Sequence, residues 1–78
     1  MTDREIGIRT ILARVLDMDE ANVDETTSSE TVSQWDSLSH INIIMLLEKK
    51  FDVSIGLDDI ANMKSFNRIR DVLSTLID

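Results

Sequence analysis

Residues 35–55 read WDSLSHINIIMLLEKKFDVSI, and this stretch decides the fold because it holds a long, regular helical pattern. The carboxylate of Asp36 is placed to accept a hydrogen bond from the backbone N–H of Ser39, as an N-cap residue does. Lys49 and Lys50 stand at the other end, where the helix dipole favours cations. We therefore predict a helix that starts at Asp36 and ends near Lys50.

This helix carries two apolar stripes instead of one. The first stripe contains Ile43, Ile44, Leu47 and Phe51. The second, rotated from the first, contains Leu38, Ile41 and Met45. A helix at the surface of a small bundle buries one stripe fully, so we expect the second to remain partly exposed. The alternative is that both stripes belong to the core.

Upstream, the spacing predicts a helix over residues 3–16. Thr2 and Glu5 have the spacing of a capping box. Gly7 weakens this helix by about 1 kcal/mol relative to alanine. Apolar residues recur at helical intervals and form one expected inner face: Ile8, Ile11, Leu12, Val15 and Leu16.

Residues 17–36 form a polar connection that is unusually long for a compact domain. Five apolar residues are expected to pin it to the bundle: Met18, Ala21, Val23, Val32 and Trp35. Trp35 precedes the helix cap, where an apolar side chain commonly packs on the following turn as a hydrophobic staple. The connection is therefore expected to be attached to the bundle.

Downstream, a short extended piece over residues 53–55 leads to Gly56 and a short helix over residues 57–62. Ser65 then caps a final helix whose expected inner face contains Phe66, Ile69, Val72, Leu73, Leu76 and Ile77. The expected fold is all-α: a small four-helix bundle, with three main helices, one short helix and a long first loop. We expect residues 1–78 to form a single domain.

Composition limits the function. The 78 residues include no cysteine, and fifteen acidic residues face eight basic ones, giving a net charge of −7. We expect no nucleic-acid partner, because duplex binding needs a basic surface. The absence of disulfides, of a signal peptide and of an apolar run long enough for membrane insertion points to the cytoplasm. No Lys or Arg lies between Arg14 and Lys49, so this acidic sector either attracts basic partners or is a solvated loop.

Ser37 occupies the first turn of the predicted helix, directly after its cap. Free backbone N–H groups and the positive end of the helix dipole favour a negatively charged group on its hydroxyl. Asp36 and Leu38 beside it offer a partner one charged and one apolar contact. An isolated serine at a helix start more often serves only as a local cap.

Residues 35–55 resemble the prosthetic-group segment of acyl and peptidyl carrier proteins. In that family an Asp-Ser-Leu motif opens the second helix, here Asp36, Ser37 and Leu38, and Glu48 and Phe51 follow in the matching arrangement. The resemblance extends over nearly the whole chain. It implies that a phosphopantetheinyl transferase attaches 4′-phosphopantetheine from coenzyme A to Ser37. It further implies a stand-alone, monomeric carrier that is not itself an enzyme.

The resemblance also implies partners and a docking surface. The arm carries acyl or aminoacyl thioesters supplied by a loading ligase and used by acyl-transferring or condensing enzymes of fatty acid, polyketide or nonribosomal peptide-type biosynthesis. Leu38, Ile41 and Met45 are expected to be apolar docking contacts, with Asp36 and Glu48 as acidic ones. Met45 and Met63 either line a space for the acyl chain or fill the core.

The sequence departs from the family pattern in one way. Asn42, Lys49 and Lys50 occupy positions that are commonly acidic in carriers of primary fatty acid synthesis, which suggests a specialised carrier.

His40 invites comparison with a Ser–His hydrolase, but a chain this short has little room for an orienting group and an oxyanion hole, so we expect His40 to face solvent. The acidic run that starts at Asp17 does not fit a calcium-binding loop, and no metal site is expected. The alternative function is an unmodified acidic helical module that binds other proteins.

Overall fold

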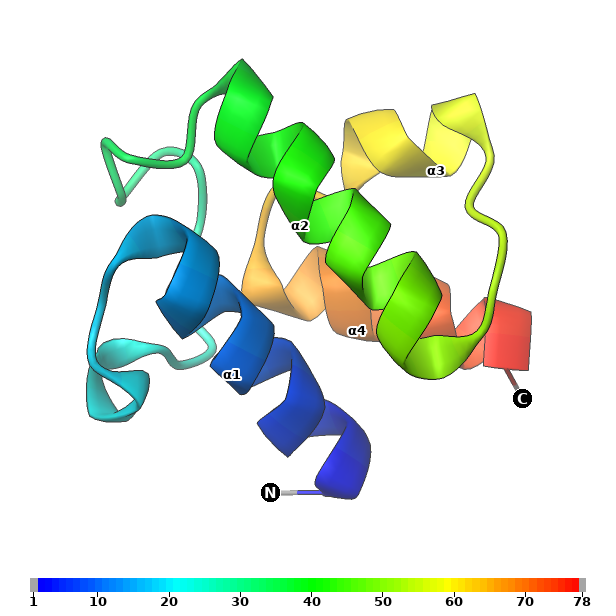
Figure 1. Ribbon diagram of the computed structural model, residues 1–78, viewed down its shortest axis with the longest axis horizontal. Coiled ribbons are helices and arrows are strands. Elements are labelled where there is room, and N and C mark those ends of the chain that lie inside the picture. The colour runs from blue at the N-terminus through cyan, green and yellow to red at the C-terminus, as the bar shows by residue number, and fades with distance from the viewer. Residues whose placement is uncertain (1, 78) are drawn as a thin grey trace.

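The computed structural model describes residues 2–77 and consists of four α-helices and one 3₁₀ turn. Helix α1 spans Asp3–Leu16, and α2 spans Ser37–Phe51. Helix α3 spans Leu57–Asn62, and α4 spans Phe66–Ile77. The predicted all-α bundle is therefore confirmed, with α1 packed against both α2 and α4 (Figure 1).

The helix ends form where the polar residues predict them. The hydroxyl of Thr2 accepts from the backbone N–H of Glu5 at 3.1 Å, and the Glu5 carboxylate accepts from the Thr2 N–H at 3.0 Å. Ser65 caps α4 through the N–H of Arg68 at 3.1 Å. These caps satisfy N–H groups that have no partner inside the helix, and so fix where each helix begins.

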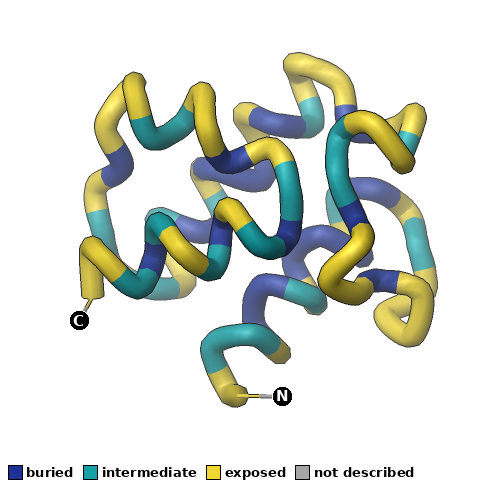
Figure 2. Tube along the Cα trace, turned by 180° about the vertical axis from the view of Figure 1, so that it is seen from behind, coloured by how far each residue is buried: buried dark blue, intermediate teal, exposed yellow. Residues whose placement is uncertain are grey.

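The core lies between the inner faces of α1, α2 and α4, as the buried segments in Figure 2 show. Ile8, Leu12 and Leu16 of α1 have no exposed surface. Phe66, Ile69 and Leu73 of α4 are equally buried. The expectation for Leu76 and Ile77 is wrong: they are about 40% exposed, because α4 runs past the packed part of α1 and α2 at its end.

The long first loop is attached to the start of α4. The N–H of Phe66 donates to the carbonyl of Thr27 at 2.9 Å, and the N–H of Ser29 donates to the carbonyl of Lys64 at 2.9 Å. Val23 is 1% exposed and lies in the core. Ala21, however, is exposed: it lies in the unpredicted 3₁₀ helix η1 (Glu20–Asn22), none of whose residues is buried.

Gly7 is a site of close helix packing as well as a weak helix former. A Cβ added at Gly7 meets the ring of Phe51 at 3.1 Å and the side chain of Lys50 at 3.4 Å. The absence of a side chain therefore lets the end of α2 lie directly against α1. This contact offsets the low helix propensity of glycine at this position.

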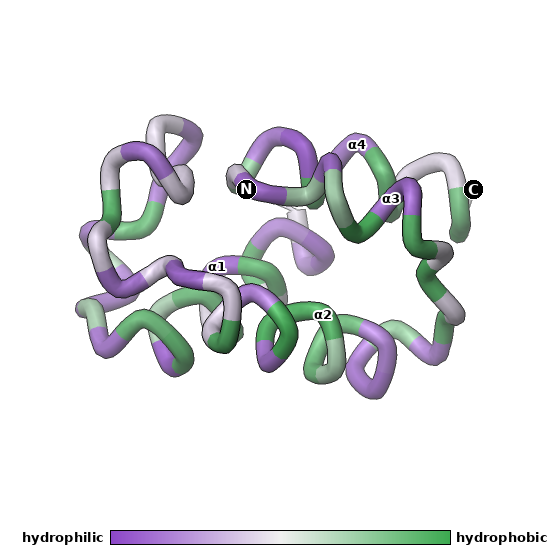
Figure 3. Tube along the Cα trace, turned by 90° about the horizontal axis from the view of Figure 1, so that it is seen from above, coloured by the Kyte–Doolittle hydropathy of each residue, from purple (hydrophilic) through white to green (hydrophobic). Residues whose placement is uncertain are grey.

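Hydrophobic residues run along most of α2 (Figure 3). Within residues 2–77 no helix has both the length and the apolar character that a bilayer span requires. The same residues hold no group of three or more His, Asp or Glu side chains arranged to bind a metal ion.

Candidate functional site

Ser37 is the first residue of α2, and its side chain is exposed. Asp36 is the N-cap, and its Oδ1 accepts from the N–H of Ser39 at 2.9 Å, as predicted. Within the described chain the Ser37 hydroxyl forms no hydrogen bond. An exposed, unbonded hydroxyl at the positive end of a fifteen-residue helix is open to modification, and an anion on it is stabilised there.

The cap also keeps Asp36 ionised. Its hydrogen bond from the backbone N–H of Ser39 lowers the pKa of the Asp36 carboxyl below its ordinary value. A negative charge is therefore present beside Ser37 throughout the neutral range.

We expect Asp36→Asn to weaken the acid sensitivity of the fold. Because the pKa of Asp36 is lowered on folding, its stabilising effect is complete above the unfolded pKa and disappears as the pH falls through the folded value. Asparagine keeps a capping oxygen but does not titrate. Between about pH 5 and pH 3 the melting temperature of the wild-type chain should fall more steeply than that of Asp36→Asn.

Thermal melts followed by circular dichroism at a series of pH values measure this difference. Two other carboxylates titrate in both proteins and supply the common background. The Thr2 backbone N–H lowers the pKa of Glu5, and the Thr26 hydroxyl lowers the pKa of Asp24. Parallel curves for the two proteins would contradict the assignment to Asp36.

The expectation that His40 faces solvent is wrong. Its side chain is 7% exposed and lies against Trp35, with ring centroids 6.2 Å apart. The indole Nε1–H of Trp35 donates to Nδ1 of His40 at 3.0 Å, and Nε2 of His40 lies 2.7 Å from the carbonyl oxygen of Ile60. Both ring nitrogens are engaged, so His40 is not available as a general base for Ser37.

These contacts also define the tautomer of His40. The Trp35 indole N–H is only a donor, so Nδ1 must be the acceptor. The Ile60 carbonyl is only an acceptor, so the proton must be on Nε2. His40 therefore links the segment before α2 to the short helix α3 through two hydrogen bonds. Trp35 and His40 stand at the two positions of a hydrophobic staple, which confirms the predicted role of Trp35.

The second stripe of α2 is exposed, as predicted. Leu38, Ile41 and Met45 have exposed fractions of 70%, 54% and 59%. The alternative that both stripes are core is wrong, because only the stripe with Ile43, Ile44 and Leu47 is buried. Three large apolar side chains in water next to Ser37 are an unusual local concentration for a small acidic protein.

Two other candidate residues have internal roles. The carboxylate of Glu48 accepts from the N–H of Ile55 at 2.8 Å, so it holds the chain that leaves α2. Met63 is completely buried and fills the core, whereas Met45 is on the surface and does not. A docking contact at Glu48 remains a prediction.

A cleft of about 490 Å³ opens beside Ser37, between the start of α2 and α3. Ile41, Leu57, Ile60 and Ala61 supply apolar lining. Leu57 is 85% exposed, and its position at the start of a short helix did not predict a place beside Ser37. Trp35 and His40 also line this cleft. Their spacing in the sequence matches a hydrophobic staple and could have predicted their contact with each other. Nothing in the sequence predicted that His40 would reach α3.

A comparison with protein families agrees with this geometry. A family model described as a phosphopantetheine attachment site matches residues 7–75, which is most of the chain and includes α2 and its exposed stripe. Domains of this family carry covalently attached 4′-phosphopantetheine, act as carriers and not as catalysts, and interact with phosphopantetheinyl transferases and biosynthetic enzymes. The chain therefore belongs to the phosphopantetheine attachment site family and is a phosphopantetheine-carrying carrier protein.

Proposed function

We propose that Ser37 bears the 4′-phosphopantetheine arm and that the chain delivers acyl or aminoacyl groups, as thioesters on this arm, to enzymes of fatty acid, polyketide or nonribosomal peptide-type biosynthesis. The observation that carries the proposal is the exposed, unbonded hydroxyl of Ser37 at the first position of α2. A modifying enzyme can approach it without unfolding any part of the bundle.

The local chemistry suits a phosphodiester. When the arm is attached, Ser37 Oγ gives its proton to a base of the transferase and forms the new bond to phosphorus, while the pyrophosphate P–O bond of coenzyme A breaks and the adenine nucleotide leaves with that bond's electron pair. The anionic linkage then lies at the positive end of the α2 dipole, near N–H groups of the first turn. The Asp36 carboxylate accepts a hydrogen bond from the Ser39 N–H. This bond partly offsets the negative charge and so reduces the repulsion between the carboxylate and a phosphate on Ser37.

The surroundings of Ser37 support a docking role for the exposed stripe. Leu38, Ile41 and Met45 give a partner enzyme an apolar contact of the kind found at the centre of protein interfaces. Asp36 adds a negative charge that attracts a basic partner residue. We propose that the loading ligase and the acyl-transferring or condensing enzymes bind this stripe while they act on the arm.

The test is a mass measurement on the intact protein. The apo chain is incubated with coenzyme A and a promiscuous phosphopantetheinyl transferase. We expect the wild-type protein to gain the mass of one phosphopantetheine, and Ser37→Ala to gain nothing. Ser39→Ala is the matched control, because it removes a hydroxyl from the same helical turn but keeps the N–H that Asp36 binds. It should be loaded like the wild type.

Circular dichroism must show that Ser37→Ala is folded. Loading of a folded Ser37→Ala protein would place the arm on another residue. A folded wild-type chain that is never loaded would favour the alternative, an unmodified acidic interaction module.

A further inference from the structure

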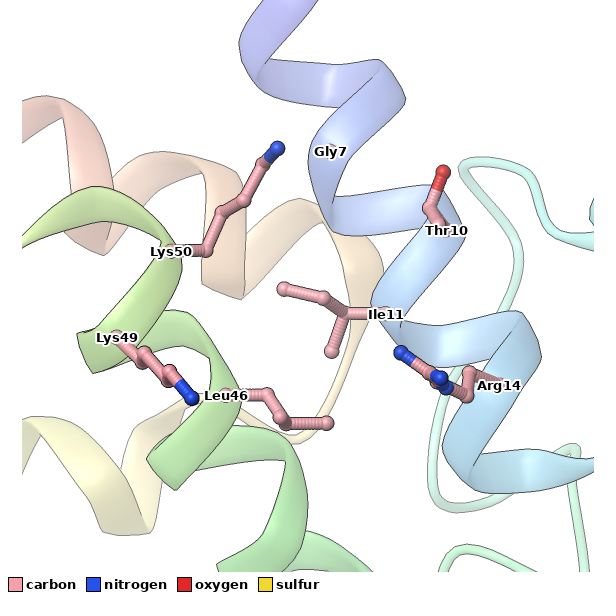
Figure 4. Close-up of a pocket in the computed structure, with 7 residues that line it drawn as sticks. All are labelled: Gly7, Thr10, Ile11, Arg14, Leu46, Lys49 and Lys50. Carbon is pink, nitrogen blue, oxygen red and sulfur yellow. The ribbon is translucent and has the colours of Figure 1, made fainter.

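A second cleft of about 490 Å³ lies between α1 and α2 and is basic, although the chain as a whole has a net charge of −7. Arg14 comes from α1, and Lys49 and Lys50 come from the last turn of α2. Figure 4 shows Arg14 and Lys49 pointing toward Leu46 from opposite sides, while Lys50 extends toward Gly7. Three of the eight basic residues of the chain therefore gather around one apolar wall.

The three cations have no counterion in the described part of the chain. None of them takes part in a salt bridge there, whereas Arg70 lies near three carboxylates. Glu20, at the edge of the cleft, instead accepts from the hydroxyl of Thr10 at 2.6 Å. Like charges gathered in a cleft raise the local potential.

The cleft continues the exposed face of α2. Leu38, Met45 and Lys49 are spaced seven and four residues apart, which places them on one side of a helix. A protein that lies along this face meets the negative Asp36 first, then the apolar stripe, and finally the positive charges around Leu46. The charge changes sign along a single docking surface.

We infer that the α1–α2 cleft receives an acidic segment of the partner enzyme that docks along α2, so that Arg14 and Lys49 pair with its carboxylates. This inference rests on the proposed function, because it extends the docking surface of that carrier. A protein segment fits better than a free anion, since the cations surround the partly buried Leu46 and adjoin the exposed Met45. An amphipathic segment with Glu and Leu side chains satisfies both features.

The test uses a synthetic amphipathic helical peptide with Leu on one face and Glu at the edge of that face. It is titrated into the ¹⁵N-labelled full chain, and amide shifts are followed by NMR. We expect shifts at Gly7, Ile11 and Leu46, and weaker binding as salt is raised. The Arg14→Gln/Lys49→Gln variant should bind the peptide about tenfold more weakly, which corresponds to about 1.4 kcal/mol.

The matched control is Lys64→Gln/Arg68→Gln, which lowers the net charge by the same amount at exposed positions outside the cleft. It should bind like the wild type. A peptide with Gln in place of every Glu should bind at least about tenfold more weakly than the acidic peptide. Equal binding of the Gln peptide, equal weakening by both double variants, or no binding would overturn the inference. Inorganic phosphate that produces the same shifts with equal affinity would also overturn it, because the cleft would then be a general anion site.

The loading assay separates this inference from the proposed function. If the wild-type chain accepts the arm but the peptide does not select the cleft, only the docking inference fails. If the wild-type chain never accepts the arm, the proposed function fails whatever the peptide does.

Discussion

Phe66→Ala is expected to remove a large part of the cooperative stability of the chain. Phe66 has no exposed surface and is the largest of the fully buried side chains. Its backbone N–H also donates to Thr27, so it stands where the long loop joins α4. Truncating a buried phenylalanine costs about 3–5 kcal/mol. A domain of 78 residues has about 4–12 kcal/mol of stability in total.

Urea unfolding followed by far-ultraviolet circular dichroism measures this loss. The matched control is Leu76→Ala, which truncates an apolar residue of the same helix that is 39% exposed. It should lower the free energy of unfolding by only about 1 kcal/mol, since the Leu76 side chain is only partly buried and its loss leaves no closed cavity. Similar losses for the two variants would show that Phe66 does not hold the core together.

His40→Ala is expected to produce the second large effect, and to concentrate it at α3. The substitution leaves the buried indole N–H of Trp35 without its acceptor, and the carbonyl of Ile60 keeps only the N–H of Met63, at 3.3 Å. An unsatisfied buried donor costs about 1–3 kcal/mol. Helix α3 has six residues, none of them fully buried, and is too short to persist alone. The link to His40 is therefore a main attachment of α3 to the bundle.

Native-state hydrogen exchange tests the local part of this prediction. Amides of α3 should lose more protection in His40→Ala than amides of α1. Trp35→Phe, which removes one of the two hydrogen bonds, should give a smaller loss of stability. His40→Gln keeps a donor for the Ile60 carbonyl and should restore part of the α3 protection. Uniform loss of protection over the whole chain would mean that His40 is a general core residue and does not serve as a specific link.

One part of the candidate site could be predicted from the sequence, and another part could not. The exposure of Leu38, Ile41 and Met45 followed from the number of apolar stripes on one helix, since a small bundle can bury only one of them. The burial of His40 did not follow, because it depends on Ile60, twenty residues away in the chain. The sequence likewise showed two lysines at the end of α2, but not that Arg14 of α1 lies beside them.

By itself, the sequence determined the elements whose causes are local. Thr2, Asp36 and Ser65 cap the helices through bonds to N–H groups three residues away, so their effect is contained in the spacing of the chain. Only the tertiary structure decided what faces Ser37 and what surrounds Lys49. The neighbours of Ser37 come from α3, and those of Lys49 come from α1. The packing of the core around Phe66 and Leu12 brings these helices beside α2, and no short-range sequence pattern contains that information.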